Sequence, residues 1–200
     1  MKKLLDNART FQQRMAPESE TYQQFAAGQS PGTLFITCSD SRIVPSLIMG
    51  SAPGEVFELR NAGNIIPPYR PGRQSGEAAT VQYAVDVLRV QDIVVCGHSH
   101  CGAIAAVAQE QDLTALPSVA EWVSFARPGL APILGTPPED LTLTNFVQAH
   151  VVAQLETLRG YPEVHAAIAD GRVQLHGWFY RVDTAQVFEL DENDNAFHCH

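Results

Sequence analysis

The stretch "TLFITCSDSRIVP", residues 33–45, joins a compact apolar run to a polar turn. The run 33–38 is apolar and β-branched and carries no charge, which is typical of a strand covered on both faces. The turn that follows presents Cys38, Asp40 and Arg42 at alternate positions. A thiol, a carboxylate and a guanidinium this close together suggest a site, whose other members have to come from elsewhere in the chain.

Two more strands are predicted downstream, at residues 54–61 and 91–98. Between them, residues 76–90 place apolar side chains at helical spacing. A strand, a helix and a strand in this order predict a right-handed crossover and parallel pairing. A further helix is expected to begin near Gly102, directly after the strand 91–98.

The rest of the chain extends this pattern to one α/β domain with a mainly parallel central sheet, flanking helices and an antiparallel edge strand. Further helices are predicted at residues 4–15, 18–28, 141–160 and 162–171, and further strands at 172–182 and 186–191. We divide the chain 1–200 into an N-terminal helical arm (1–30), an α/β core (33–182), and an edge strand with a tail (183–200). The final "FHCH", residues 197–200, is expected to be a frayed end.

Bulk composition restricts the class of protein. The 200 residues suffice for one domain with its own core, and a formal net charge of -9 argues against nucleic acid as a partner. No apolar run approaches the roughly 18 residues that a membrane span needs, so no membrane is expected. The first residues lack the apolar segment of a signal peptide, and we predict a cytoplasmic protein.

The predicted location also bears on the four cysteines. They are Cys38, Cys96, Cys101 and Cys199. Without an export signal, metal binding or catalysis is favoured over disulfides. Cys96 lies inside the apolar strand 91–98 and is expected to be a buried core thiol.

The predicted strands bring candidate metal ligands to one edge of the sheet, since ligands of open α/β sheets bind outside the carboxyl ends of the strands. Cys38 ends the first strand, His98 ends the third, and Cys101 follows at the start of a helix. Two thiolates and one imidazole suit a catalytic zinc that keeps one position open. The alternatives are an H-x-x-C of purely structural role and a capped turn with a surface ion pair.

Asp40 and Arg42 leave two arrangements open. Asp40 could bind the metal directly and close the site. Held instead by the planar fork of Arg42, it would accept a hydrogen bond from water at the metal.

The segments "CSDSR" (38–42), "RNAGNIIPPY" (60–69) and "GHSHCGAI" (97–104) resemble, in this order and spacing, the β-class carbonic anhydrases. The resemblance extends over residues 4–182 and is closest to the plant-like and bacterial branch. It implies one Zn2+ per chain, held by Cys38, His98 and Cys101, with Asp40 and Arg42 as the catalytic dyad. It also implies that a zinc-bound hydroxide attacks CO2 in an apolar cleft, giving bicarbonate and a proton.

The resemblance further implies a substrate cleft and an assembly. Substrate-binding positions would be Gln29, Phe57, Ala62, Tyr83 and Gly102. Members of the family form a homodimer or a higher oligomer built from dimers, with the cleft near the subunit interface. The first two helices would then pack on the partner subunit.

The residues and the resemblance leave several alternatives open. One branch of the family closes its site by bicarbonate, using a tryptophan where this chain has Phe35, so the resemblance predicts the open form. Hydrolysis of carbonyl sulfide or carbon disulfide is a second candidate activity, and a non-catalytic zinc module is a third. His100 could relay protons or be an exposed turn residue.

Overall fold

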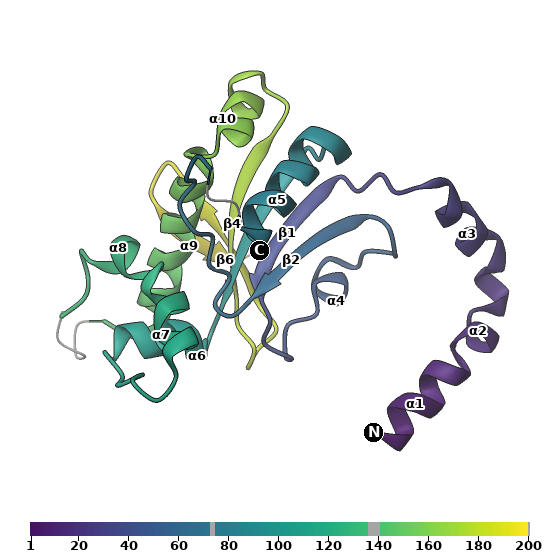
Figure 1. Ribbon diagram of the computed structural model, residues 1–200, viewed down its shortest axis with the longest axis horizontal. Helices are drawn as coiled ribbons and strands as arrows, with labels where there is room; N and C mark the ends of the chain where they lie inside the picture. The colour runs from purple at the N-terminus through teal and green to yellow at the C-terminus, as the bar shows by residue number, and fades with distance from the viewer. Residues whose placement is uncertain (73–74, 136–140, 200) are drawn as a thin grey trace. The chain divides into compact units, whose positions relative to one another are not determined.

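The computed structural model describes residues 1–72, 75–135 and 141–199 (Figure 1). Contacts within the chain divide it into two compact units, Met1–Ser30 and Pro31–His200. The first unit is entirely helical where it is regular, and the second contains the sheet.

The core unit is built on a six-stranded sheet with the order β2-β1-β3-β4-β5-β6. Its strands are β1 (Thr33–Cys38), β2 (Val56–Asn61), β3 (Asp92–His98), β4 (Gln174–Tyr180), β5 (Val187–Asp191) and β6 (Ala196–Cys199). The first four are parallel, and β5 and β6 are antiparallel to their neighbours. The predicted fold class, a mainly parallel sheet with an antiparallel edge, is confirmed.

The antiparallel edge holds one strand more than the sequence predicted. The tail was expected to fray, but Ala196–Cys199 pairs with β5 and forms the outermost strand β6. The turn before it is closed by side chains, because Asp191 Oδ1 accepts from Asn193 N and Asp194 Oδ1 accepts from Ala196 N. This turn brings a short segment without a strong apolar pattern back along β5. His200 lies outside the described residues.

Helices cover the sheet unequally. Leu34, Ile36, Ile93 and Val95 belong to a buried cluster that also contains side chains of α5, α9 and α10, so these helices lie on one face of the sheet (Figure 1). The alternate residues of β1 and β3 belong to a separate, smaller cluster on the other face. The helices of the core unit are α4 (Pro45–Met49), α5 (Gly76–Gln82), the π-helical turn η3 (Tyr83–Leu88), α6 (Gly102–Ala108), α7 (Pro117–Ser124), α8 (Arg127–Leu130), α9 (Leu143–Arg159) and α10 (Pro162–Ala169).

The structure refines the predicted helices. The helix predicted at 76–90 is α5 followed by η3, and α9 and α10 lie within the predicted ranges. The short helices α4, α7 and α8, of four to eight residues, were not predicted. Among the described residues, no helix is both long and apolar enough to cross a bilayer.

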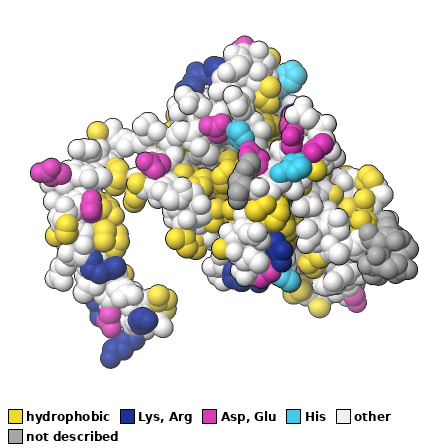
Figure 2. Space-filling model, turned by 180° about the vertical axis from the view of Figure 1, so that it is seen from behind, with side chains coloured by type: hydrophobic (Ala, Val, Ile, Leu, Met, Phe, Trp, Pro, Cys, Tyr) yellow, Lys and Arg dark blue, Asp and Glu magenta, His cyan; other side chains and the backbone are white. Residues whose placement is uncertain are grey.

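The N-terminal unit consists of α1 (Lys2–Arg9), α2 (Phe11–Arg14), α3 (Ser19–Gln24) and two short 3-10 turns. The helix predicted at 4–15 is interrupted at Thr10. None of the helices in this unit has a buried residue, and Leu4 is 67% exposed. Figure 2 shows hydrophobic side chains open to solvent along this unit. Its apolar residues therefore lack a core of their own.

Candidate metal centre and active site

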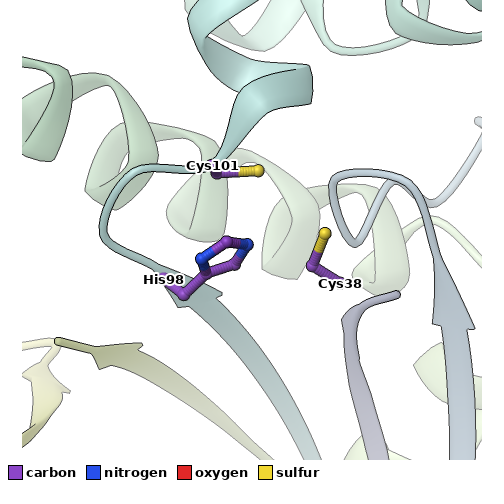
Figure 3. A group of neighbouring side chains, drawn as sticks. All are labelled: Cys38, His98 and Cys101. Carbon is purple, nitrogen blue, oxygen red and sulfur yellow. The ribbon is translucent and has the colours of Figure 1, made fainter. Parts of the chain in front are cut away.

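Three chain segments place a thiol, an imidazole and a second thiol together. Cys38 is the last residue of β1, His98 is the last residue of β3, and Cys101 directly precedes α6. Figure 3 shows the three side chains pointing toward one another. One potential ligand atom from each lies within 4.8 Å of the other two, and all three residues are buried. Parallel pairing of β1 with β3 produces this convergence, because it brings their carboxyl ends to the same edge.

The imidazole of His98 is oriented as a metal ligand. Its Nδ1 lies 2.9 Å from the carbonyl oxygen of Ser99, so Nδ1 carries the proton and donates. Nε2 then has a free lone pair, and it is a buried atom without a hydrogen-bonding partner among the described residues. Histidine ligands of zinc usually donate a hydrogen bond from the ring nitrogen that does not bind the metal, and this bond fixes the tautomer.

The two thiols are electrostatically coupled. A hydrogen bond from Cys101 and another from the Gly63 N–H lower the pKa of Cys38 to about 4, although burial raises it. The thiolate of Cys38 and burial raise the pKa of Cys101. The pair therefore holds one negative charge readily and a second one only with a cation between the sulfurs. Two thiolates with one neutral imidazole are a donor set that zinc prefers, so these residues fit this metal.

Asp40 is held by Arg42 beside this centre. The Nε of Arg42 donates to Asp40 Oδ1 at 2.9 Å, and its second terminal nitrogen donates to Oδ2 at 2.7 Å. This two-point hydrogen bond holds the pKa of the Asp40 carboxyl far below its usual range. Asp40 Oδ2 also lies 4.0 Å from His98 Nε2. A fixed carboxylate acceptor thus faces the atom that would bind the metal.

Arg60 supports the turn that carries these groups, a role that was not predicted from the sequence. From β2, its guanidinium donates to the carbonyl oxygens of Cys38 at 2.9 Å, Asp40 at 3.0 Å and Ile43 at 2.9 Å. One side chain therefore satisfies three backbone acceptors of the turn 38–43. The only sequence signal for this role was that Arg60 belongs to the segment 60–69. Its hydrogen-bonding partners are backbone carbonyls, which every residue carries, so they cannot be recognised in a sequence.

The predicted substrate-binding residues are distributed unequally. Ala62 is exposed and precedes the glycine that contacts Cys38, and Gly102 is exposed at the first position of α6. Phe57 and Tyr83 contact each other, with ring centroids 5.9 Å apart. Gln29 belongs to the N-terminal unit.

Phe57 and Tyr83 do not reach the metal ligands of their own chain. In the register of β1 and β2, Phe57 lies opposite Leu34, whereas Asn61 lies opposite Cys38. Four residues along a strand correspond to about 13 Å. These two aromatic residues therefore lie toward the other end of the strands from Cys38.

The structure also shows the burial and the contacts of the other residues discussed from the sequence. Cys96 is fully buried, as expected for a core thiol, and burial raises its pKa to about 12. Phe35 is fully buried and packs edge-on against Trp178. His100 is exposed in a left-handed turn, and its carbonyl oxygen accepts from Arg42 at 3.3 Å. A proton relay through its ring stays a prediction.

Fold and donor set together define an α/β protein with a candidate zinc centre at the carboxyl edge of its parallel strands. The family model for carbonic anhydrase matches residues 33–187. Carbonic anhydrase 1 of Escherichia coli O157:H7 is 42% identical, over 98% of this chain and 91% of its own length. A carbonic anhydrase of Pseudomonas aeruginosa is also 42% identical, over 98% of this chain and 90% of its own.

Solved structures agree with these relatives. The β-carbonic anhydrase CcaA has a TM-score of 0.94 at 34% identity, covering 100% of this chain and 99% of its own. A Coccomyxa β-carbonic anhydrase, solved with acetazolamide, has a TM-score of 0.80 at 31% identity, covering 98% of this chain and 91% of its own. The chain belongs to the carbonic anhydrase family, in its β class, and is an enzyme of that family.

Proposed function

We propose that the protein catalyses the reversible hydration of carbon dioxide to bicarbonate and a proton, with one zinc ion held by Cys38, His98 and Cys101. The observation that carries this proposal is the buried Nε2 of His98, which has no partner within the described part of the chain and lies beside two thiol sulfurs, with Asp40 already engaged by Arg42. When bound, zinc supplies a Lewis acid that makes water acidic, to a pKa of about 7 in carbonic anhydrases that hold it with three histidines.

The chain's own groups then orient the reactants. Asp40 Oδ2 accepts a hydrogen bond from the reacting water molecule and thereby directs an oxygen lone pair at the carbon of CO2. Arg42 keeps Asp40 ionised and aims its carboxylate, and its two-point grip disfavours a move of Asp40 to the metal. Each turnover consumes one water and one CO2 and yields one bicarbonate and one proton, which leaves to buffer.

We also propose that a second copy of the chain completes each substrate cleft. If Phe57 and Tyr83 line a cleft, the strand register puts them too far from Cys38 to line that of their own chain. A symmetric dimer can bring them to the partner's metal centre. The apolar side chains exposed along Met1–Ser30 are candidates for the same contact, with Gln29 at its end. A solved relative from Sordaria macrospora is described as tetrameric. The cytoplasmic location stays a prediction.

The proposed activity is tested by stopped-flow measurement of CO2 hydration above neutral pH, on protein shown by metal analysis to hold one zinc per chain. Carbonyl sulfide is assayed in parallel. Rapid CO2 hydration with slow hydrolysis of carbonyl sulfide is expected. The reverse ranking would assign the site to the hydrolase activity, and zinc-loaded protein inactive on both would leave only the non-catalytic module.

A further inference from the structure

The loop between β2 and α5 brings a backbone N–H to the Cys38 sulfur. The amide of Gly63 donates to Cys38 Sγ at 3.3 Å. The side chain of Asn61 closes the loop, since its Nδ2 donates to the carbonyl of Ile65 and its Oδ1 accepts from the amide of Ile65, each at 2.8 Å. The loop is thus a closed turn with one amide directed at the metal centre.

Gly63 has a conformation that only glycine tolerates there. Its φ is +85°, and a Cβ at this position would lie 2.9 Å from the Cβ of Ala103 in α6. Because glycine has no side chain to anchor it, the direction of the Gly63 N–H depends on the two peptide groups that flank this residue.

A separate side chain holds each of these two peptide groups. The peptide group between Ala62 and Gly63 carries the N–H that donates to Cys38, and its carbonyl accepts from Trp122 Nε1 at 2.8 Å. The carbonyl of the next peptide group, that of Gly63, lies 2.9 Å from His150 Nε2. Because a carbonyl only accepts, the His150 ring carries its proton on Nε2 and donates.

The hydrogen bonds of Trp122 and Cys38 form a chain through one peptide group. An indole N–H that donates to a carbonyl polarises the amide and strengthens the hydrogen bond that the same amide donates. His150 is fully buried in α9, and its Nδ1 is unpartnered among the described residues, so its place is fixed by packing and by this one contact. Both donors come from helices that lie outside the loop.

We propose that Trp122 and His150 are positioning residues of the metal centre, which hold the peptide groups on either side of Gly63 so that its N–H faces Cys38 Sγ. This inference rests on the proposed zinc site. The N–H fixes the direction of the Cys38 sulfur, so the thiolate is already oriented for the metal and binds it more tightly. Outer hydrogen bonds of this kind contribute about 10–100-fold in metal affinity or activity.

The test compares single substitutions. Trp122→Phe keeps an aromatic ring against Phe125 and removes the N–H, and His150→Leu removes the other donor. His150→Gln retains an N–H that can reach the Gly63 carbonyl. Gln154→Met is the matched control, because Gln154 lies one turn further along α9 and accepts from the amide of Ile66, not of Gly63, at 2.6 Å. Circular dichroism and urea unfolding establish that each variant is folded.

Two readouts are measured besides activity: the zinc dissociation constant, by chelator competition, and the thiolate-to-cobalt charge-transfer band of the cobalt-substituted protein. Trp122→Phe and His150→Leu should weaken zinc binding about 10-fold or more. They should also move the band to longer wavelength, because a thiolate without its N–H partner gives up charge more easily. His150→Gln and Gln154→Met should resemble the wild type.

The outcomes separate this inference from the proposed function. A wild-type protein that binds no zinc, or that binds zinc and does not hydrate CO2, would defeat the proposed function. A functional wild type whose affinity and band are unchanged by Trp122→Phe and His150→Leu would overturn the positioning role. So would equal shifts in the Gln154→Met control. If His150→Leu does not fold, Trp122→Phe alone decides.

Discussion

Asp40 combines two properties at the candidate metal centre. Its carboxylate is fixed at both oxygens by Arg42, and it still lies 4.0 Å from His98 Nε2. The low pKa of Asp40 keeps it ionised throughout the range in which the enzyme would work. Its charge and its lone pairs are therefore constant, and the contribution that we propose for it is to direct a water molecule.

Asp40→Asn should consequently separate catalysis from metal binding. The amide keeps the shape of the carboxylate and loses its charge, so water is no longer oriented. We expect one zinc per chain to remain and the CO2 hydration rate to fall by about 100-fold or more. Cys38→Ser is the comparison, since it should lose zinc and rate together. An Asp40→Asn variant with the full rate would remove Asp40 from the reaction.

His150 predicts a pH dependence of stability. Burial outweighs the hydrogen bond to the Gly63 carbonyl and the attraction of the Cys38 thiolate, and it lowers the pKa of His150 from 6.5 to about 4. As pH falls below 6.5, His150 takes up a proton in the unfolded chain. In the folded chain it stays neutral until the pH reaches about 4. The stabilisation is therefore complete above 6.5 and is lost progressively as pH falls toward 4, by about 3 kcal/mol in all.

His150→Gln lacks this titration and keeps a donor for Gly63. Between pH 7 and pH 4, the wild type should lose about 3 kcal/mol more of its free energy of unfolding than the variant does. Urea unfolding at the two pH values measures this difference. The other acid-sensitive groups, the thiols included, are common to both proteins. Equal losses in the two proteins would show that the buried ring accepts its proton without a penalty.

At the residue scale, the part of the site that the sequence predicts consists of side chains at strand ends. Cys38 and His98 each end a recognisable apolar run, so their convergence follows from parallel pairing. The contacts around Gly63 could not be predicted, because they join backbone atoms of a loop to side chains of α7 and α9. Trp122 and His150 occupy amphipathic helices, where an aromatic or histidine residue ordinarily signals only packing.

Secondary-structure elements also divide into those that the sequence predicts and those that it does not. Continuous apolar runs predict the buried parallel strands, since such strands need no alternation. The strand β6 has only four residues, and pairing with β5 rather than its own pattern makes it a strand. The short helices of the core unit likewise depend on tertiary contacts more than on propensity. Short elements are thus harder to predict, although α10, of eight residues, was predicted.

Contact between β3 and α9 depends on one small residue. A Cβ on Gly97 would lie 2.7 Å from Val147 Cγ1 and 2.7 Å from Val151 Cγ2. Gly97→Ala should lower the free energy of unfolding by about 1–3 kcal/mol, because α9 has to move away from the sheet. Adding Val147→Ala should restore part of the loss, as measured by urea unfolding. Strictly additive losses would show that α9 is displaced for another reason.

At the scale of the whole molecule, the predicted parts of the site lie apart within one chain. The candidate metal ligands lie at the carboxyl ends of β1 and β3, and the Phe57–Tyr83 pair lies about 13 Å away along the strands. The N-terminal unit, meanwhile, has apolar side chains and no core. Both features are accounted for if two copies exchange parts, so that each copy supplies aromatic residues to the other's zinc.

Complementation between inactive chains tests this exchange directly. One chain carries Cys38→Ser, which removes the zinc and leaves Phe57 and Tyr83 intact, and the other carries Phe57→Ala with Tyr83→Ala, which keeps the zinc. Two affinity tags isolate the mixed dimer. One of its two sites then combines an intact zinc centre with intact aromatic residues, so about half of the wild-type activity per dimer is expected.

Each chain alone should form dimers of low activity, and these are the controls for the mixed preparation. Tyr83 is 44% exposed, so Tyr83→Ala alone can replace the double substitution if loss of Phe57 prevents folding. If the aromatic pair served its own chain, the mixed dimer would contain one site without zinc and one without aromatic residues, and its activity would equal the mean of the two parents. Recovery above that mean therefore requires that the cleft be shared between subunits.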